Sequence, residues 1–431
     1  MFKFSIEKKC DFIQSLVSDQ IMTASQNMII ISTVSSLIKI IKFSQEIKTF
    51  SANADAVVVG GNILELYFLN TDKMIAFPEF TNVKVVQIFM DFIVVATEAE
   101  LIVLKMFNQE ISEFQRIKLV KFILCVNIGN LPGTQVTYIL TGGTDNNLCL
   151  YLLSQNSDCF IRKTVLKGHK DWIKSIDVKE INQDLMIASA SQDGFIRLWK
   201  ISNNILKELN TNVHKLDVCG QEFYLTFHAL LTGHEDWVNS VRWHPDSEEL
   251  KLVSASADKS IIIWSFDQES GVWYNQVRLG DVGGTVLGYY GALVLPGGNR
   301  LLAHGYHGAL QAWDLVDGSW VSTLGTTGHS SSVQDICWNP SGTFLLSTSL
   351  DQTTRLWAEW NRNGVKSWHE MARTQIHGYD LQVLAFINEY EYVSGADEKI
   401  LRVFEANRNF VESLEGITQT QMIYDKVLSS V

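Results

Sequence analysis

The sequence contains a near-copy pair: residues 166–176 read Leu166-Lys-Gly-His-Lys-Asp-Trp-Ile-Lys-Ser-Ile, and residues 231–241 read Leu231-Thr-Gly-His-Glu-Asp-Trp-Val-Asn-Ser-Val. Each copy continues with the same spacing, 24 positions from the histidine to an aspartate and six more to a tryptophan, which gives His169, Asp193 and Trp199, then His234, Asp258 and Trp264. This shared spacing indicates an internal repeat.

Short apolar runs lie between these repeated positions. Met186-Ile-Ala-Ser-Ala-Ser and Leu252-Val-Ser-Ala-Ser precede the aspartates, and Phe195-Ile-Arg-Leu-Trp and Ile261-Ile-Ile-Trp follow them. Their length and β-branched content predict strands separated by polar turns. A Gly-His turn, a Ser-rich strand, an Asp turn and a strand ending in Trp form the pattern of a WD-repeat propeller blade. We therefore predict an all-β WD-repeat β-propeller.

Composition narrows the function class. Of the 431 residues, 46% are hydrophobic, 11% aromatic and 19% charged, which is typical of sheets buried on both faces and not of a disordered chain. The formal net charge of -12 argues against a general nucleic-acid surface, because phosphate neutralisation needs clustered Lys and Arg. Six cysteines without Cys-x-x-Cys spacing favour a reducing compartment. With no signal-peptide or membrane-span pattern, we expect a soluble protein in the cytoplasm, with the nucleus as a second location.

The interval from a turn to a large apolar residue six positions later serves as a ruler for counting blades. Nine candidates fit it: residues 35–41, 61–67, 98–104, 145–151, 193–199, 258–264, 307–313, 351–357 and 398–404. The first two are only 26 residues apart, which indicates either a short blade or a wrong register there. Asp193 and Asp258 are 65 residues apart, which is more than one blade needs. The extra residues fall in 201–230, a polar stretch that predicts a long surface loop. Helices of any length are not predicted.

Seven blades are a common ring size, so we expect two domains. Residues 1–318 would form a seven-bladed WD-repeat propeller, with Phe2-Lys-Phe-Ser-Ile closing the ring against the last blade. Residues 319–431 would form two further blade-like repeats, the start of a second, incomplete propeller. Repeats without neighbours are poorly stable, so the apolar faces of these two should need covering.

The recurring His, Ser, Asp and Trp are the strongest site candidates. Ser, His and Asp are hydrolase constituents, but a catalytic site is built once and this set occurs in several blades. We therefore predict no catalytic, cofactor or metal residues, and interpret the sets as buried hydrogen-bond networks that satisfy each polar group. The predicted networks are His169, Ser189, Asp193 and Trp199; His234, Ser254, Asp258 and Trp264; and His329, Ser347, Asp351 and Trp357.

Two further features are candidates for partner binding. Trp172 and Trp237 follow the Gly-His-x-Asp turns, where exposed aromatics would form a binding hot spot and buried ones would only pack between blades. A basic run that includes Lys167, Lys170 and Lys174 is either a solvated rim or an electrostatic contact to RNA or an acidic partner. His304 and His307 are three apart, a spacing that tends to point strand side chains to opposite faces, and no third ligand is near, so we predict no metal there.

Longer strings resemble one family, the Elongator complex subunit 2 proteins. The matching segments include Gly233-His-Glu-Asp-Trp-Val-Asn-Ser-Val, Gln375-Ile-His-Gly-Tyr-Asp-Leu and Ser394-Gly-Ala-Asp-Glu-Lys-Ile-Leu-Arg-Val-Phe-Glu-Ala. Ordinary WD repeats share the Gly-His and Trp positions but not these strings. The likeness covers residues 160–411, whereas residues 1–159 match only in blade rhythm.

The resemblance implies a pair of seven-bladed propellers in one chain, of which this sequence would hold seven blades plus two. It implies a non-catalytic scaffold in a complex that modifies wobble uridines of tRNA, where a radical-SAM subunit carries the chemistry. The implied partners are the largest and the catalytic Elongator subunits, with a weak indirect contact to tRNA and none to a membrane. Alternatives are a free-standing WD-repeat adaptor for other proteins and an enzyme that uses the central channel, for which no convergent cluster of titratable residues is found.

Overall fold

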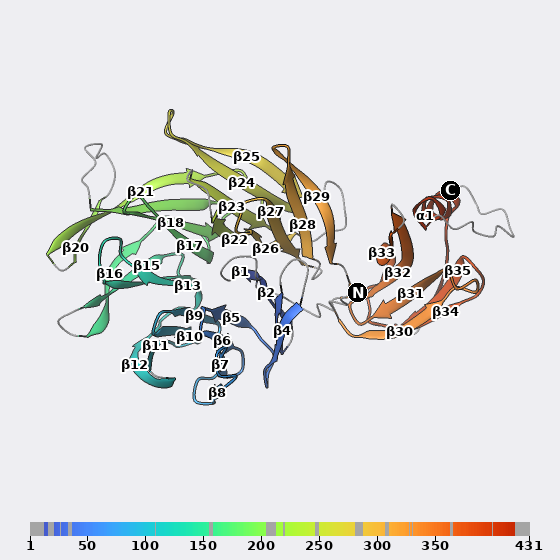
Figure 1. Cartoon of the computed structure of the whole chain (residues 1–431), viewed down its shortest axis with the longest axis horizontal. Helices are drawn as coiled ribbons and strands as arrows, with labels where there is room; N and C mark the ends of the chain where they lie inside the picture. The colour runs from blue at the N-terminus through green and yellow to red at the C-terminus, as the bar shows by residue number, and fades with distance from the viewer. Residues whose placement is uncertain are drawn as a thin grey trace. The chain divides into compact units, whose positions relative to one another are not determined.

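The computed structural model describes residues 13–15, 21–25, 27–32, 37–107, 109–154, 158–203, 213–218, 220–245, 250–280, 288–306, 310–326, 328–329, 331–362, 365–398 and 400–418. These residues form strands and one helix (Figure 1). They divide into two compact units, a larger unit that ends at Leu324 and a smaller unit that begins at Gly325.

The larger unit contains seven antiparallel sheets within its described residues, and we call them blades 1 to 7. Blades 1 to 3 comprise β1 (Ile13–Ser15), β2 (Ile21–Ser25), β3 (Met28–Ser32) and β4 (Leu37–Lys42); β5 (Thr49–Ala52), β6 (Ala56–Gly60), β7 (Leu64–Phe68) and β8 (Met74–Phe77); and β9 (Val85–Phe89), β10 (Phe92–Ala96), β11 (Glu100–Phe107) and β12 (Glu110–Lys118). Blades 4 and 5 comprise β13 (Ile123–Asn130), β14 (Thr137–Gly143), β15 (Leu148–Ser154) and β16 (Cys159–Leu166); and β17 (Ile173–Ile181), β18 (Asp184–Ser191), β19 (Ile196–Ser202), β21 (Gln221–Leu231) and β20 (His214–Val218). Blades 6 and 7 comprise β22 (Val238–Trp243), β23 (Lys251–Ser256), β24 (Ser260–Asp267) and β25 (Val272–Gly280); and β26 (Tyr289–Val294), β27 (Arg300–Gly305), β28 (Leu310–Val316) and β29 (Ser319–Thr326).

The seven blades close into a ring. The first strand of each blade is innermost, and consecutive inner strands touch from β5 through β9, β13, β17 and β22 to β26 (Figure 1). β26 of blade 7 also contacts β1 of blade 1, which brings the last blade beside the first. The predicted closing strand, Phe2-Lys-Phe-Ser-Ile, lies outside the described residues.

The hydrophobic core lies between blades, and β18 shows why. Leu185 and Ile187 pack in a cluster with residues of blade 4. Met186 and Ala188, which alternate with them, pack in a cluster with residues of blade 6. Because successive side chains of a strand point to opposite faces, a strand between two blades needs apolar or small residues at every position. This explains the continuous Ala- and Ser-rich runs in the sequence.

A repeated β-bulge positions the inner strands. In β17, Ile173 pairs with Ser191 but Ser175 already pairs with Ala190, so one extra residue lies between them. The same shift recurs at the start of three other inner strands, β13, β22 and β26, and at the start of β30 and β34, the first strands of two further sheets. A bulge increases the local twist and redirects the next side chain, so each inner strand presents equivalent positions to the centre.

The prediction of a long surface loop over residues 201–230 is wrong for most of its described part, and residues 204–212 and 219 lie outside the described residues. Residues 214–218 and 221–231 form β20 and β21, and β20 adds a fifth strand to blade 5. Phe223 and Leu225 are buried in the cluster shared with blade 4. The polar residues that suggested a loop alternate with these apolar ones, as expected of a strand with one solvated face.

The early register also needs correction. Residues 35–41, counted as the third strand of a blade, lie largely on β4, the fourth strand of blade 1, and the third strand is β3. The 26-residue interval therefore joined non-equivalent strands and does not mark a short blade.

The expected domain boundary after residue 318 falls between β28 and β29. Strand β29 lies beside β28 as the outer strand of blade 7. The larger unit therefore extends to Leu324.

The smaller unit contains two sheets and a helix in its described part. Its elements are β30 (Val333–Trp338), β31 (Phe344–Ser349), β32 (Thr353–Arg362) and β33 (Val365–Ile376) in blade 8; β34 (Leu381–Phe386), β35 (Glu391–Ala396) and β36 (Leu401–Glu405) in blade 9; and α1 (Arg408–Thr418).

The helix α1 was not predicted from the sequence. The Asn407 side chain caps its start by accepting the backbone N–H of Phe410 at 2.8 Å. Its buried residues Val411, Leu414 and Thr418 follow helical spacing and place it over the apolar cluster shared by blades 8 and 9. The helix therefore buries part of the apolar surface that two unpartnered blades would expose.

Substituting Phe223 tests the reassigned segment. The side chain of Phe223 is 1% exposed, so Phe223→Ala is expected to lower the free energy of unfolding by about 3 to 5 kcal/mol. The neighbouring Tyr224 bonds the exposed Glu222, and Tyr224→Ala is the matched control with an expected loss below about 1 kcal/mol. Urea unfolding of the full chain measures both. Equal, small losses would mean that this segment is a loop after all.

Candidate functional site

The first predicted network is assembled in blade 5. His169 lies with its Nδ1 2.9 Å from Asp193 Oδ2 and its Nε2 2.9 Å from Ser189 Oγ. The indole N–H of Trp199 donates to the same Ser189 Oγ at 3.4 Å. Asp193 also accepts the backbone N–H of Lys170 at 2.9 Å. The network thus connects the Gly-His turn to β18, to the Asp turn and to β19.

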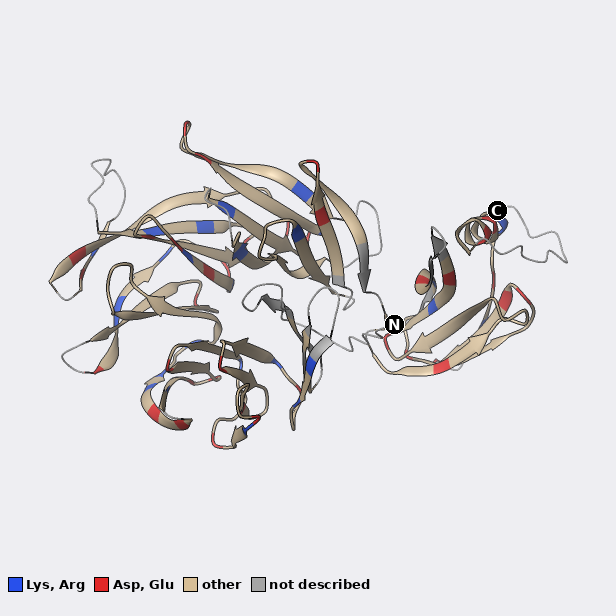
Figure 2. Cartoon of the chain, viewed as in Figure 1, with Lys and Arg blue, Asp and Glu red and all other residues tan. Residues whose placement is uncertain are grey.

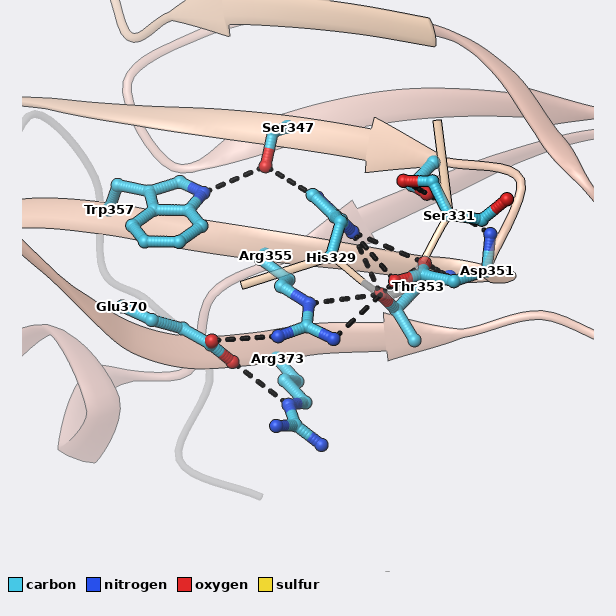
Figure 3. Close-up of polar contacts among 10 residues, drawn as sticks. His329, Ser331, Ser347, Asp351, Thr353, Arg355, Trp357, Glu370 and Arg373 are labelled. Carbon is cyan, nitrogen blue, oxygen red and sulfur yellow. Dashed lines mark hydrogen bonds and ion pairs between the residues drawn. The ribbon is translucent and has the colours of Figure 1, made fainter. Parts of the chain in front are cut away.

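Blades 6 and 8 contain the same arrangement. In blade 6, His234 lies 2.8 Å from Asp258 and 2.7 Å from Ser254, whose Oγ accepts the Trp264 indole N–H at 2.8 Å. In blade 8, shown in Figure 3, the distances from His329 are 3.0 Å to Asp351 and 2.7 Å to Ser347, and the donor to Ser347 at 2.7 Å is Trp357. The structure therefore brings together the members of each predicted set.

In blade 8 the network continues through three residues that sequence reasoning missed. Arg355, only 1% exposed, donates to Glu370 at 2.8 Å and to Asp351 at 3.4 Å, and Arg373 donates to Glu370 at 2.8 Å (Figure 3). Burial raises the pKa of the Glu370 carboxyl, but the two arginines outweigh burial and lower it overall. Arg355, the arginine in Asp351-Gln-Thr-Thr-Arg-Leu, could have indicated this extension of the network from the sequence, because a strand buried between blades rarely carries an unpaired charge.

Blade 9 has a variant of the network that the sequence spacing did not predict. His377 Nδ1 lies 2.9 Å from Glu398 Oε1, and its Nε2 lies 3.4 Å from Ser394 Oγ. Glutamate replaces the usual aspartate, Phe404 replaces the tryptophan, and the interval is 21 positions, against 24 in blades 5 and 6 and 22 in blade 8. Phenylalanine has no N–H to donate, so this network lacks its fourth member.

These networks are cross-links within blades and do not form a reaction centre. Both ring nitrogens of His169, His234 and His329 contact partners of their own blade, and the serine oxygen of each set already accepts an indole N–H. The set occurs three times in equivalent places. Each copy satisfies polar groups that would otherwise be buried without partners, which is a structural role.

The aspartate of the network has a shifted pKa. Burial would raise the pKa of Asp193, but hydrogen bonds from His169 and from the backbone N–H groups of Lys170 and Phe195 outweigh it and lower the pKa to about 2. Similar contacts from His234 and Ser260 lower the pKa of Asp258. Both carboxylates therefore stay ionised in the folded chain well below the pH at which they protonate in an unfolded one.

The candidate partner-binding tryptophans are exposed. Trp172 is 44% and Trp237 is 46% exposed, and each directly precedes the inner strand of its blade. Phe122, which sequence reasoning missed, is 51% exposed and directly precedes the inner strand of blade 4.

The backbone carbonyls of these three aromatic residues occupy equivalent positions. Each accepts a backbone N–H at 2.9 Å, from Thr144, Gln192 or Ala257. Three consecutive blades thus present an exposed aromatic at one register, and we call Phe122, Trp172 and Trp237 the aromatic row. In the sequence, each of these aromatic residues directly precedes an apolar run that forms a strand, and this pattern could have identified Phe122 as well.

The candidate lysines differ in exposure. Lys167 and Lys170 are exposed, whereas Lys174, on β17, is only half-exposed. The acidic Glu235 and Asp236 occupy the corresponding turn of blade 6, so the basic character belongs to blade 5. Figure 2 shows both charge signs interspersed along the described strands.

The described residues also bear on metal binding and on membrane insertion. Among those that the structure describes, no group of three or more His, Cys, Asp or Glu side chains is placed to hold a metal ion. His304 is buried on β27, and His307 lies outside the described ranges. No helix in the described part of the chain is long and apolar enough to cross a bilayer.

Comparison with known proteins agrees with this geometry. The sequence profile of the WD domain, G-beta repeat, matches residues 160–200, 225–265 and 318–358. Elongator complex protein 2 of Danio rerio is 40% identical over 322 residues, which are 70% of this chain and 39% of that protein. The Homo sapiens protein of the same name is 41% identical over 320 residues (69% and 38%), and that of Schizosaccharomyces pombe is 35% identical over 302 residues (65% and 39%).

Radial sheets with recurring His-Ser-Asp-Trp networks, together with the repeat matches, define the chain as a WD-repeat β-propeller protein. Within that class it is a relative of Elongator complex protein 2, which confirms the resemblance found in the sequence. The chain spans about two fifths of the length of these curated relatives, from 38% to 39% in the three compared.

Removing the histidine of one network tests its structural role. His169→Ala leaves Asp193 and Ser189 buried without their shared partner, which is expected to lower the free energy of unfolding by about 1 to 3 kcal/mol. Lys170→Ala removes an exposed neighbouring side chain and should have little effect. Chemical unfolding measures both variants. An unchanged midpoint for His169→Ala would refute the network.

The lowered pKa of Asp193 predicts a pH dependence. A carboxyl whose folded pKa lies below its unfolded value stabilises the fold above the unfolded pKa, and that contribution is lost as pH falls. The free energy of unfolding should therefore decrease as pH falls from about 3.8, the ordinary pKa of an aspartate, towards about 2, and Asp193→Asn should show a shallower decrease. Unfolding free energies at a series of pH values between these limits measure the slope. Identical slopes in the two proteins would exclude Asp193 as a titrating group.

Proposed function

We propose that this chain is a non-catalytic scaffold subunit of the Elongator complex and supports wobble-uridine modification of tRNA. The observation that carries the proposal is 40% identity, over 70% of the chain, to a protein named Elongator complex protein 2. The buried, internally bonded networks favour a structural use of the His, Ser and Asp side chains over a catalytic one.

The scaffold role requires surfaces that bind other subunits, and the aromatic row is our candidate. Large aromatics that lose their water on binding supply much of the energy of protein interfaces. Phe122, Trp172 and Trp237 retain 51%, 44% and 46% exposure, so they can still bury area against a partner. The lysines of blade 5 lie beside Trp172 in the sequence and would attract an acidic partner surface.

We propose that the partners are the largest subunit and the radical-SAM catalytic subunit of the Elongator complex. We also propose that assembly takes place in the cytoplasm, with the nucleus as a second location. A contact with tRNA would be weak and indirect, since the net charge is -12. The competing function is a free-standing adaptor for other proteins, and recovery of partners from cells separates the two.

Affinity purification of the tagged full chain tests the proposal. Recovery of the largest and catalytic Elongator subunits is expected. The double variant Trp172→Ala, Trp237→Ala should weaken their binding by about 2 kcal/mol or more, as for hot-spot aromatics, so most of the recovered partner is lost.

The control is Phe107→Ala, which removes an aromatic that is 72% exposed at the end of β11. Unchanged thermal melts would show that the variants remain folded. Recovery of other proteins without Elongator subunits would favour the adaptor. Equal recovery by the double variant and the control would place the interface elsewhere.

A further inference from the structure

A pocket of about 120 Å³ lies where the inner strands of blades 5, 6 and 7 meet. We call it the inner-strand pocket. Its polar lining comes from Lys174 on β17, from Asn239, Ser240 and Arg242 on β22, from Tyr290 on β26 and from His304 on β27. Water occupies about 30 Å³ per molecule in the liquid, so the pocket has room for a few waters or one small polyatomic ion.

The pocket contains two cations whose donors remain available. Lys174 and Ser240 line the pocket, and within the described part of the chain neither side chain has a hydrogen-bond or ion-pair partner. Arg242 Nη1 lies 3.9 Å from Asp177 Oδ1, an ion pair that is too long for a hydrogen bond, and the Arg242 side chain keeps 42% exposure. Asp177 instead accepts the backbone N–H of Trp243 at 2.7 Å. Positive charge and unused donors therefore converge on one side of the pocket.

His304 supplies an independent observation. It is 5% exposed, and neither ring nitrogen has a hydrogen-bond partner among the described residues. Burial lowers the pKa of His304 to about 4, so the ring is neutral at physiological pH and has one unused N–H donor. Buried polar groups are almost always bonded, and an exception in a native structure calls for a water or an ion.

Equivalent positions in neighbouring blades show that the buried histidine at residue 304 is specific to blade 7. The bulge pairs Ser175 with Ala190 in blade 5 and Ser240 with Ala255 in blade 6. In blade 7 the equivalent pair is Gly291 and His304. A Cβ on residue 291 would lie 2.6 Å from the His304 ring, so glycine makes room for the imidazole. Blades 5 and 6 are built with Ser and Ala at these positions, and blade 4 with Cys125 and Gly142, so the fold does not require a buried histidine here.

We propose that the inner-strand pocket binds a small oxyanion, either a phosphate or a carboxylate. The Arg242 guanidinium can donate two parallel hydrogen bonds to such a group, Lys174 adds a second charge, and Ser240 and His304 can donate further bonds. The anion has two possible sources, a free ion or the carboxylates of an acidic protein segment. Lys174 and Asn239 lie two residues beyond Trp172 and Trp237, so an acidic segment on the aromatic row would reach the pocket.

Isothermal titration of the full chain tests the site with two probes, inorganic phosphate and a short glutamate peptide, at ionic strength balanced with chloride. Saturable binding of at least one probe is expected. Lys174→Gln should weaken it about tenfold, the effect of losing one charge-assisted hydrogen bond. Lys118→Gln removes an exposed lysine on β12 of blade 3, outside the pocket and outside the basic run of blade 5, and should leave the affinity unchanged.

Histidine-selective nitrogen NMR provides a second readout, in which the bound probe should shift the ring signals assigned by His304→Gln. Phosphate binding without peptide binding identifies a free ion, and preferential peptide binding identifies an acidic segment. No saturable binding of either probe, or equal weakening by the two lysine variants, would overturn the proposal. Neither result depends on Elongator subunits, so the test is separate from that of the scaffold function.

Discussion

The buried histidine that joins two turns and two strands is the interaction on which the well-formed blades depend. A sheet alone does not fix where its turns lie, and strands that are buried on both faces lack the apolar-polar alternation that usually sets register. In blade 5, His169 connects the turn before β17 to Ser189 on β18 and to the Asp turn before β19. Moving either strand by one residue would break these bonds inside the core, where unpaired polar groups are costly.

Blades without this network are held by other means. In blade 2, Val57, Val58 and Val59 are fully buried, and the buried Glu65 accepts a hydrogen bond from the Ser44 hydroxyl at 2.6 Å. In blade 7, Tyr289 is fully buried on the inner strand and its hydroxyl donates to Gln311 at 2.6 Å. Blades of the same architecture are thus stabilised by different side-chain contacts. Blade 7, which lacks the His-Ser-Asp-Trp network, also contains His304, whose ring nitrogens have no hydrogen-bond partner among the described residues.

The sequence could predict what depends on fixed spacing. The network residues were found because His169, Asp193 and Trp199 recur at the same intervals in blade 6. Phe223 and Leu225 were missed because every second residue of β21 is polar, and alternation in a segment between strong repeats was interpreted as a loop. His304 could not be assigned because its significance lies in which atoms do not bond it. That information comes from packing and is absent from any local pattern.

The offset between sequence repeats and blades explains both the misplaced boundary and the structure of blade 9. The matched repeats begin on β16, on β21 and directly before β29, each the strand that pairs with the third strand of its blade, and they continue into the next blade. One sequence repeat therefore contributes strands to two neighbouring blades. A blade that is counted as ending at its Trp-containing strand loses the strand that follows, which belongs to the same sheet. Blade 9 has three described strands, and the next element along the chain is α1, which covers the cluster shared with blade 8. Leu401 and Val403 on β36 keep 70% and 58% exposure, so the helix covers the inter-blade core but leaves this strand available to a further sheet or subunit.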